Sequence, residues 1–362
     1  MPEEIPTLCS QCATRLGIAE YEDGECEVCG GIMDDMGLAD AIDPTFEYHS
    51  FNVGVVLPPS VSKREKELVT GLRLKDVRGI KAQLNAVLRE RISKRLGKEA
   101  VLVEPDVVFE IDYVKKRVFF RIKSLTLYGR YCKYERGIPQ TKWYCTRCRG
   151  KGCKHCNFEG KMYPTSVEEI VAEPILALTA GRESRFHGAG REDIDVRMLG
   201  DGRPFVIEII YPKKRTLDLA ALREAINGDG RVSIGPLSYC EKGLVEKIKN
   251  GKFKKTYVAY LDQKLNDDEI KNVKTNIVGE IQQRTPIRVS HRRSDKIRKR
   301  KVYKVLEKNN TTTELEIYCD GGLYIKELIS GDEGRTVPSV TDIVGRHVLC
   351  EKLDVIKIHC ED

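Results

Sequence analysis

The chain has 362 residues, with 62 Lys and Arg against 55 Asp and Glu, and a formal net charge of +7. This length exceeds one compact core of ordinary size, so we expect two or three domains. No run approaches the roughly 18 apolar residues of a membrane helix, and the acidic start lacks an apolar signal core. The sequence therefore predicts a soluble, cytoplasmic protein without a membrane partner.

The 13 cysteines are not spaced as a disulfide framework, because eight of them form four C-x-x-C pairs. Thirteen residues separate the first two pairs, a spacing that lets two tight turns place four thiolates tetrahedrally around one Zn²⁺. Four protein ligands leave no open coordination position, so the zinc is expected to be structural and to fold residues 1–44. The predicted ligands are Cys9, Cys12, Cys26 and Cys29.

Residues 45–135 have the pattern of an α/β module. We expect a strand over residues 50–56, a helix over residues 80–96 that Gly97 ends, and strands over residues 107–113 and 118–124. The exposed face of the helix is basic, which fits either a solvated surface or an RNA contact. The order of these elements resembles a THUMP domain, an RNA-binding module of tRNA-modifying enzymes.

Residues 136–164 form a linker rich in Gly, Lys and Cys. Its two C-x-x-C pairs are separated by only four residues, which is short for two independent metal-binding knuckles. A second zinc site and four reduced, unliganded thiols both remain open. The cysteines concerned are Cys145, Cys148, Cys153 and Cys156.

Residues 165–362 predict a mixed α+β domain, because strands outnumber helices and short hairpins alternate with longer connections. Ser166 and Glu169 mark the beginning of its first helix as a capping box. No Walker loop is present, and no G-x-G-x-x-G lies between a strand and a helix. We therefore expect no nucleotide or S-adenosylmethionine cofactor.

The stretch from residue 190 to residue 211 predicts a loop followed by a β-hairpin that turns at Gly200-Asp201-Gly202. Asp193 lies where the loop enters the first strand, beside Arg191, which would keep the carboxylate ionised. A solvated turn aspartate is the alternative. Alternation places Asp195 on the same strand face, so it is the second candidate for a catalytic carboxylate.

A basic segment follows between residues 284 and 308, where eleven Lys or Arg and two acidic residues give a local excess of +9. We expect it to be a loop laid along a phosphate backbone, with a nucleic acid as partner. The phosphate-binding candidates are Arg292, Arg293, Arg298 and Lys299.

Several motifs together resemble the pseudouridine synthases. GRED at residues 190–193 is similar to their aspartate motif, and GLYIKEL at residues 322–328 resembles their Tyr-Ile-Arg/Lys motif. Residues 283–303 occupy the place of their basic motif, and Leu353 the place of their late leucine. With the zinc site, the THUMP-like module and RYCKYERGIPQTKW at residues 130–143, the whole chain resembles the family called Pus ten, found in archaea and eukaryotes.

This resemblance implies a pseudouridine synthase fold for residues 165–362 and isomerisation of uridine 55, and probably 54 as well, in the T-arm of tRNA. Asp193 would be the catalytic carboxylate, as nucleophile or as base for the ribose 2′ proton, held charged by Arg191 and Lys326. Tyr257 would stack on the base and assist removal of the C5 proton. Ile325 and Leu353 would wall the pocket. Catalysis would need no cofactor, and no obligate protein partner is evident.

Three other classes share part of this pattern. A non-catalytic tRNA-binding protein would have the zinc site, the THUMP-like module and the basic segment, but would not need Asp193, Tyr257 and Lys326 together. A zinc-ribbon DNA-binding protein would be indifferent to the ribose 2′-hydroxyl. A THUMP-bearing methyltransferase or thiolase is disfavoured by the missing cofactor loop.

Overall fold

The computed structural model describes residues 5–308 and 312–360, apart from the side chain of Arg292. It divides into two compact units: Met1–Ser124 with Ile210–Arg215 form unit 1, and Leu125–Ile209 with Thr216–Asp362 form unit 2. Within the described part, no helix is both long and apolar enough to cross a bilayer. The division lies about ten residues before the predicted domain boundary at residue 135.

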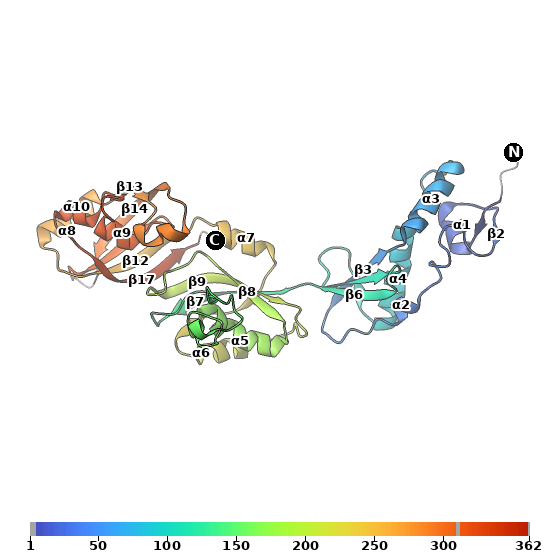
Figure 1. The fold of residues 1–362 in the computed structure, drawn as a ribbon, viewed down its shortest axis with the longest axis horizontal. Helices are drawn as coiled ribbons and strands as arrows, with labels where there is room; N and C mark the ends of the chain where they lie inside the picture. The colour runs from blue at the N-terminus through green and yellow to red at the C-terminus, as the bar shows by residue number, and fades with distance from the viewer. Residues whose placement is uncertain (1–4, 309–311, 361–362) are drawn as a thin grey trace. The chain divides into compact units, whose positions relative to one another are not determined.

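Unit 1 contains a four-stranded sheet with a helix packed on it (Figure 1). Ser50–Val56 pairs in parallel with both Glu99–Ala100 and Val107–Asp112. Val107–Asp112 also pairs with Arg117–Ile122, and that pair is antiparallel. The strands, in order across the sheet, are β4 (Glu99–Ala100), β3 (Ser50–Val56), β5 (Val107–Asp112) and β6 (Arg117–Ile122).

Helix α4 (Ile80–Leu96) confirms the predicted helix and covers this sheet. Its apolar residues recur every four positions, so Ile80, Leu84, Leu88 and Ile92 are all buried along one side. The helix ends at Gly97, whose φ of 62° is a left-handed conformation that glycine adopts without strain. A second helix, α3 (Pro59–Gly71), precedes it and has proline in its first turn.

The cysteine-rich segment belongs to the same unit. It forms β1 (Thr7–Leu8), α1 (Ser10–Leu16), β2 (Glu22–Asp23) and α2 (Gly37–Asp40). Leu8, Cys12 and Cys29 lie in one continuous apolar cluster with Phe51 of the sheet and Leu88 of the helix. The first 44 residues therefore share a core with the module that follows them.

Unit 2 is built on one eleven-stranded sheet, which is the mixed sheet that the sequence predicts. Its pairs are antiparallel except where the ninth and seventeenth strands run parallel. The main order is β10 (Val232–Ile234), β7 (Leu125–Lys133), β9 (Arg197–Ile210), β17 (Cys350–His359), β12 (Lys254–Leu261), β15 (Glu314–Cys319), β14 (Ile297–Glu307), β13 (Gly279–Arg284) and β16 (Thr336–Val337), with β11 (Ser238–Tyr239) beside β7 and β8 (Glu183–Gly188) beside β9.

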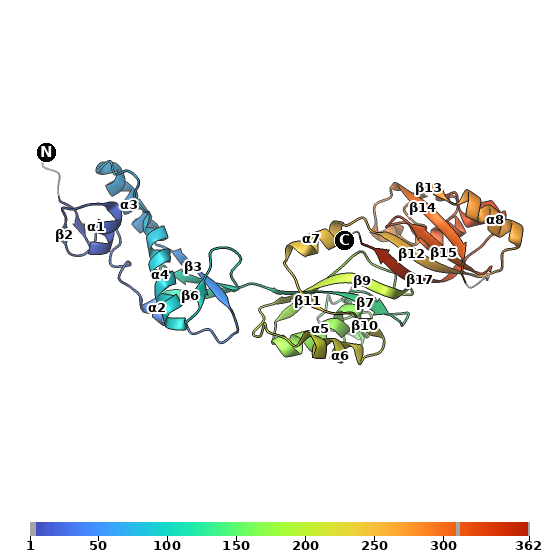
Figure 2. The ribbon, with the colours of Figure 1, turned by 180° about the vertical axis from the view of Figure 1, so that it is seen from behind.

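Two groups of helices cover this sheet. α5 (Val167–Thr179) and α6 (Leu219–Asn227) lie side by side against the end formed by β7, β9 and β10 (Figures 1 and 2). α8 (Asp267–Asn276), α9 (Ile325–Ser330) and α10 (Val340–Val344) pack on one another at the other end. Ser166 caps α5 as predicted, since its Oγ accepts a hydrogen bond from the Glu169 amide at 3.2 Å.

The predicted hairpin at residues 200–202 is wrong, because β9 is one strand of 14 residues. Tyr131 of β7 faces Arg203, but Lys133 faces Met198, so residues 199–202 form a wide bulge in the strand. Gly200 and Gly202 have φ of 61° and 71°. A Cβ at residue 200 would collide with the carbonyl oxygen of Ile356 in β17. The two glycines therefore serve close strand packing, which resembles a turn in sequence.

The basic segment is also not the predicted loop. Residues 279–284 and 297–302 pair in register as the antiparallel strands β13 and β14, and the 3₁₀-helix η2 (Ile287–Arg292) lies between them. Cross-strand ion pairs make this dense charge compatible with a sheet. Lys299 Nζ lies 2.9 Å from Glu280 Oε1 on the neighbouring strand.

Candidate active site and metal-binding clusters

A cavity of about 430 Å³ opens at the centre of the unit 2 sheet, over the neighbouring strands β9, β17 and β12. This volume suits a ligand of nucleotide size. The cavity brings together eight of the residues that the sequence predicts for the site: Arg191, Asp193, Tyr257, Arg293, Arg298, Ile325, Lys326 and Leu353. The side chain of Arg292 lies outside the described residues.

The loop that carries Asp193 is fixed from beneath by the preceding residue, Glu192. The Glu192 side chain is fully buried and forms an ion pair with Arg203 of β9, with 2.8 Å between Oε2 and Nε. Its oxygens also accept from the Tyr131 hydroxyl, at 2.8 and 2.9 Å. The Lys133 ammonium lies 3.9 Å away and is equally buried. Both β7 and β9 therefore hold this carboxylate.

Arg203 and Lys133, together with Gln140, also bind the backbone of the loop. Arg203 Nη1 donates to the Ala189 carbonyl at 2.7 Å, and Gln140 Nε2 donates to the Gly190 carbonyl at 2.9 Å. Lys133 Nζ donates to the carbonyls of Asp193 and Ile194 at 3.3 and 3.1 Å. Side chains from β7 and β9, together with Gln140, thus bind the carbonyls of residues 189, 190, 193 and 194. These hydrogen bonds keep the Asp193 carboxylate at one place on the cavity wall.

Burial and charge act in opposite directions on Glu192. Burial alone would raise its pKa, but Arg203 and Lys133 more than offset this, so the pKa lies below its usual range. The pKa of Lys133 is lowered, because burial disfavours its charge more strongly than Glu192 favours it. Burial raises the pKa of Tyr131 well above its usual value, so its hydroxyl remains a donor.

Asp193 is held by a residue that the sequence analysis missed. Its Oδ2 lies 2.9 Å from Nη1 of Arg288 in η2, and both side chains are about one-third exposed at 35%. Arg288 Nε also contacts Glu327 of α9 at 2.5 Å. Burial would lower the pKa of Arg288, but Glu327 and Asp193 outweigh it and raise this pKa, so the guanidinium stays charged.

The expected partners of Asp193 are therefore corrected. Arg191 makes no ion pair with any described residue, and Lys326 Nζ pairs with Asp195 Oδ2 instead. Burial would raise the pKa of Asp195, but the contact with Lys326 lowers it below the usual range. Asp193 and Asp195 also do not lie on a strand, since β9 begins only at residue 197 and the amide of Val196 closes a turn onto the Asp193 carbonyl.

The apolar side of the cavity is formed as the sequence predicts. Tyr257 of β12 is 8% exposed, Leu353 of β17 is 6% exposed, and Ile325 at the beginning of α9 is 2% exposed. Burial raises the pKa of Tyr257, so its hydroxyl stays protonated and is a poor base. This environment supports the stacking role over the proposed removal of a proton.

The basic segment contributes unequally to the cavity. Arg293 lines the cavity and is exposed, and Arg298 also lines it while donating to the Thr285 hydroxyl at 2.9 Å. Lys299 does not line the cavity and forms an ion pair with Glu280. Strand alternation explains the difference, because Arg298 and Lys299 point to opposite faces of β14.

Comparison with known proteins agrees with this geometry. The family "Pus10, C-terminal" matches residues 126–359, and "Pus10 THUMP domain, archaeal" matches residues 38–112. The tRNA pseudouridine synthase Pus10 of Methanocaldococcus jannaschii is 44% identical over 356 residues, covering 95% of this chain and 78% of that protein. Pus10 of Archaeoglobus fulgidus is 39% identical over 360 residues, covering 97% and 99%.

The chain belongs to the Pus10 family of tRNA pseudouridine synthases. Its expected THUMP module is confirmed by the family match at residues 38–112. Among solved structures, a Cbf5-Nop10-Gar1 complex shows a weaker likeness, with 19% identity, a TM-score of 0.33, and coverage of 53% of this chain and 45% of that chain.

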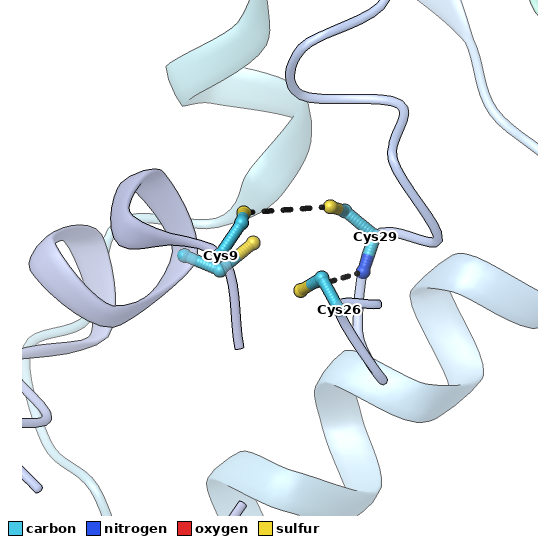
Figure 3. A group of neighbouring side chains, drawn as sticks. Cys9, Cys26 and Cys29 are labelled. Carbon is cyan, nitrogen blue, oxygen red and sulfur yellow. Dashed lines mark hydrogen bonds between the residues drawn. The ribbon is translucent and has the colours of Figure 1, made fainter. Parts of the chain in front are cut away.

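This Pus10 chain also has two clusters that could hold a metal ion. The Sγ atoms of Cys9, Cys12, Cys26 and Cys29 all lie within 4.8 Å of one another, and Figure 3 shows the side chains of three of them converging. The Cys29 amide donates to Cys26 Sγ at 3.4 Å, and Arg15 Nη2 donates to Cys12 Sγ at 3.6 Å. Such donors stabilise thiolates, so the residues present fit a cation with soft ligands.

The second cluster has the same form despite its short spacing. The Sγ atoms of its four cysteines, at positions 145, 148, 153 and 156, also lie within 4.8 Å of one another. The amides of Cys153 and Gly160 donate to Cys156 Sγ at 3.3 and 3.2 Å. Gly150, Gly152 and Gly160 have positive φ, which lets the two knuckles fold back on each other across four residues.

We predict that Glu192→Gln destabilises unit 2 by about 3–5 kcal/mol, because it leaves Arg203 and Lys133 buried without their counter-charge. Urea unfolding followed by Trp143, the single tryptophan, would measure this. The pKa of Glu192 is depressed, so its stabilisation is present above the unfolded value of about 4.3 and is lost as pH falls through the folded value.

Glu183→Gln is the matched control, since the Glu183 side chain is 44% exposed and its ion-pair partner among the described residues is the nearby Arg185. Its effect should be within about 0.5 kcal/mol. Equal stabilities of the Glu192→Gln and Glu183→Gln proteins would contradict the anchoring role of Glu192.

Proposed function

We propose that this chain isomerises uridine 55, and also uridine 54, in the T-arm of tRNA to pseudouridine, with Asp193 as the catalytic carboxylate. The observation that carries the proposal is the position of Asp193. It lies on a loop tied down by hydrogen bonds, at the wall of a nucleotide-sized cavity that the buried side chains of Tyr257 and Leu353 also line. An exposed turn aspartate would have no such surroundings.

The chemistry suits these residues. The enzyme must break the N1–C1′ bond, turn the free base and rejoin it through C5, without redox change. One ionised carboxylate is sufficient, either as nucleophile at C1′ or as base for the 2′ proton. Arg288 Nη1 lies 2.9 Å from Asp193 Oδ2 and is the cationic partner of this carboxylate in the free enzyme. Ile325 and Leu353 would exclude water from the cleaved intermediate.

The target uridine must leave the folded tRNA arm to enter the cavity. Tyr257 offers an aromatic face on which the extruded base can stack. Arg293 and Arg298 line the same cavity and belong to the basic segment, so they would bind phosphates near the extruded nucleotide. Lys299 remains a candidate for a more distant phosphate, since its charge is shared with Glu280.

We further propose that both cysteine clusters bind zinc. Each offers four thiol sulfurs within 4.8 Å, the donor set of closed, structural Zn²⁺ sites. Such a site fixes the fold of the segment around it and takes no part in the reaction. Cys12, Cys26 and Cys29 are buried in the core of unit 1, so losing the first metal should loosen that core.

We expect Asp193→Asn to abolish tritium release from tRNA labelled at uridine C5, while the affinity for tRNA changes little. The substitution keeps the shape of the side chain and removes the charge that the reaction needs. Asp195→Asn is the matched control on the same turn, and it should keep most of its activity. Full activity of the Asp193 variant would refute its catalytic role.

The two positions can be separated with tRNA transcripts in which uridine 54 or uridine 55 is replaced by cytidine. Each single replacement should leave tritium release from the other position, and the double replacement should abolish it. Release from the doubly replaced transcript would show that the enzyme acts elsewhere.

We predict that replacing Arg293 and Arg298 with alanine weakens tRNA binding and flattens its salt dependence. Each lost phosphate contact should reduce the slope of log K against log salt by about 0.7–0.9. The Lys299→Ala change should have a smaller effect. Lys271 on α8 is exposed and does not line the cavity, so Lys271→Ala should change neither quantity. An unchanged slope in the double arginine variant would contradict this role.

Protein purified without chelator should contain two zinc ions per chain by elemental analysis. Replacing Cys9 and Cys12 with serine should remove one zinc and lower the melting temperature of unit 1, because their cluster lies in its core. Replacing Cys145 and Cys148 should remove the other. Cys240→Ser should leave the metal content unchanged, and metal-free wild-type protein would refute both sites.

A further inference from the structure

Lys255 occupies a place in the cavity that the mechanism above does not use. It lies on β12 two residues before Tyr257, so both side chains project from the same face of the strand. The residue is only 8% exposed and lines the cavity. A Cβ at Gly190 would lie 3.0 Å from Lys255 Nζ, and one at Gly321 would lie 3.8 Å from its Cε. The end of the Lys255 side chain therefore lies between the loop that carries Asp193 and the Gly321 turn that precedes α9.

The charges around Lys255 do not balance. Three buried cations surround one buried carboxylate, because Glu192 interacts electrostatically with Arg203, Lys133 and Lys255. Arg203 forms an ion pair with Glu192 and donates to the Ala189 carbonyl. Lys133 forms an ion pair with Glu192 and donates to three carbonyls. The Lys255 ammonium makes no hydrogen bond or ion pair with any residue that the structure describes, and the backbone of Lys255 pairs only within the sheet.

Such a lysine works against folding. Burial and the nearby Arg203 lower the pKa of Lys255 to about 7, while Glu192 and Cys319 oppose this decrease. An unpaired buried cation is normally avoided in a protein interior. A group that is costly to fold and points into a cavity is typical of a residue retained for its ligand.

We propose that Lys255 is a further catalytic residue, which donates a hydrogen bond to a carbonyl oxygen of the target uracil and stabilises the negative charge on the cleaved base. This inference rests on the proposed function. When the N1–C1′ bond breaks, its electron pair stays on N1, and the charge spreads to the carbonyl oxygens. Lys255 keeps its proton throughout. The negative charge is neutralised when C5 bonds to C1′, after which C5 loses its proton to solvent and N1 takes one up.

The position favours the base over a phosphate. Lys255 lies beside Tyr257, on which the base would stack, and it is buried whereas Arg293 at the cavity wall is exposed. An ammonium in such a water-poor site stabilises a developing anion far more than it would in water. Because the charge is greatest after bond cleavage, the contact should accelerate the reaction more than it tightens binding.

The first test compares Lys255→Met with wild-type protein, since methionine keeps most of the apolar stem and removes the charge. Single-turnover tritium release should fall about 100-fold or more, as for the loss of one oxyanion-hole donor. The affinity for tRNA should change less than about twofold. The melting temperature, followed through Trp143, should stay the same or rise, because the repulsion by Arg203 is relieved. A purely structural lysine predicts a lower melting temperature, and that result would overturn the proposal.

Lys254→Met is the matched control. Lys254 precedes Lys255 on the same strand but lies over the Tyr303 ring, 4.7 Å from its centroid, and does not line the cavity. This variant should keep the wild-type rate. A loss of tRNA affinity without a loss of single-turnover rate in Lys255→Met would instead assign Lys255 to a phosphate and overturn its role at the base.

The second test uses tRNA containing 5-fluorouridine, whose base is a more stable anion and needs less stabilisation. Consumption of this nucleoside, measured by nuclease digestion and mass spectrometry, should be reduced less by Lys255→Met than consumption of uridine. An equal reduction for both substrates would overturn the proposal. If wild-type protein does not act on uridine at all, the proposed function itself fails. Wild-type activity with an undiminished Lys255→Met rate overturns only the role of Lys255.

Discussion

The buried carboxylate of Glu192 is the interaction on which the site depends. It lies between two strands, and its cationic partners also bind the carbonyls of the loop that surrounds it. A loop of this kind would otherwise be mobile, since the backbone hydrogen bonds within it form only short turns, one from Gly190 to Gly188 and one from Val196 to Asp193. Buried ion pairs add little to the free energy of unfolding on average. A conformation that separates the two charges leaves a buried charge unpaired and is costly, so the ion pair favours one conformation of the loop. Here the selected arrangement fixes the direction of the neighbouring Asp193.

A second set of contacts joins this loop to the basic segment. Arg288 bridges Asp193 and Glu327, so η2, the loop that carries Asp193 and α9 meet at one guanidinium. Arg293 and Arg298 lie a few residues further along the same segment. A polyanion bound to these arginines would therefore contact a segment that already touches Asp193, the proposed catalytic carboxylate. The proposed phosphate-binding arginines and the partner of Asp193 lie close together because the segment from β13 to β14 supplies all of them.

The sequence predicted the parts of this structure whose causes are local. Helix α4 follows from its apolar period and from Gly97, and the cap of α5 follows from Ser166. The first cysteine cluster follows from spacing alone. The family motifs placed Asp193, Tyr257 and Leu353 in one cavity, although nothing in the local pattern distinguished Asp193 from a solvated turn residue.

The errors arose where distant segments determine the outcome. Gly200 looked like a turn residue because its role, clearance for the Ile356 carbonyl, depends on a strand far along the chain. The basic segment looked like a loop because its charge is too dense for an unpaired strand. Its pairing with β13, which neutralises part of this charge, is not visible in the sequence. The partner of Asp193 was misassigned to Arg191 and Lys326, since an ion pair between a loop and a 3₁₀-helix far apart in the chain leaves no trace in spacing. Glu192 and Lys255 had only weak signals in the sequence. Glu192 lies inside the aspartate motif, and strand alternation places Lys255 on the same face as Tyr257.

The cations of unit 2 fall into two kinds that composition cannot distinguish. Lys133 and Arg203 are buried and have protein partners for their charge, so they belong to the fold. Arg293 is exposed at the cavity, where water and salt can solvate it until a phosphate arrives. Lys255 is buried like the first kind and unpaired like the second. Because Glu192 offsets the charge of Lys255 only in part, the remaining compensation would come from what enters the cavity. A base that becomes anionic only during the reaction would supply it at the step where it lowers the barrier.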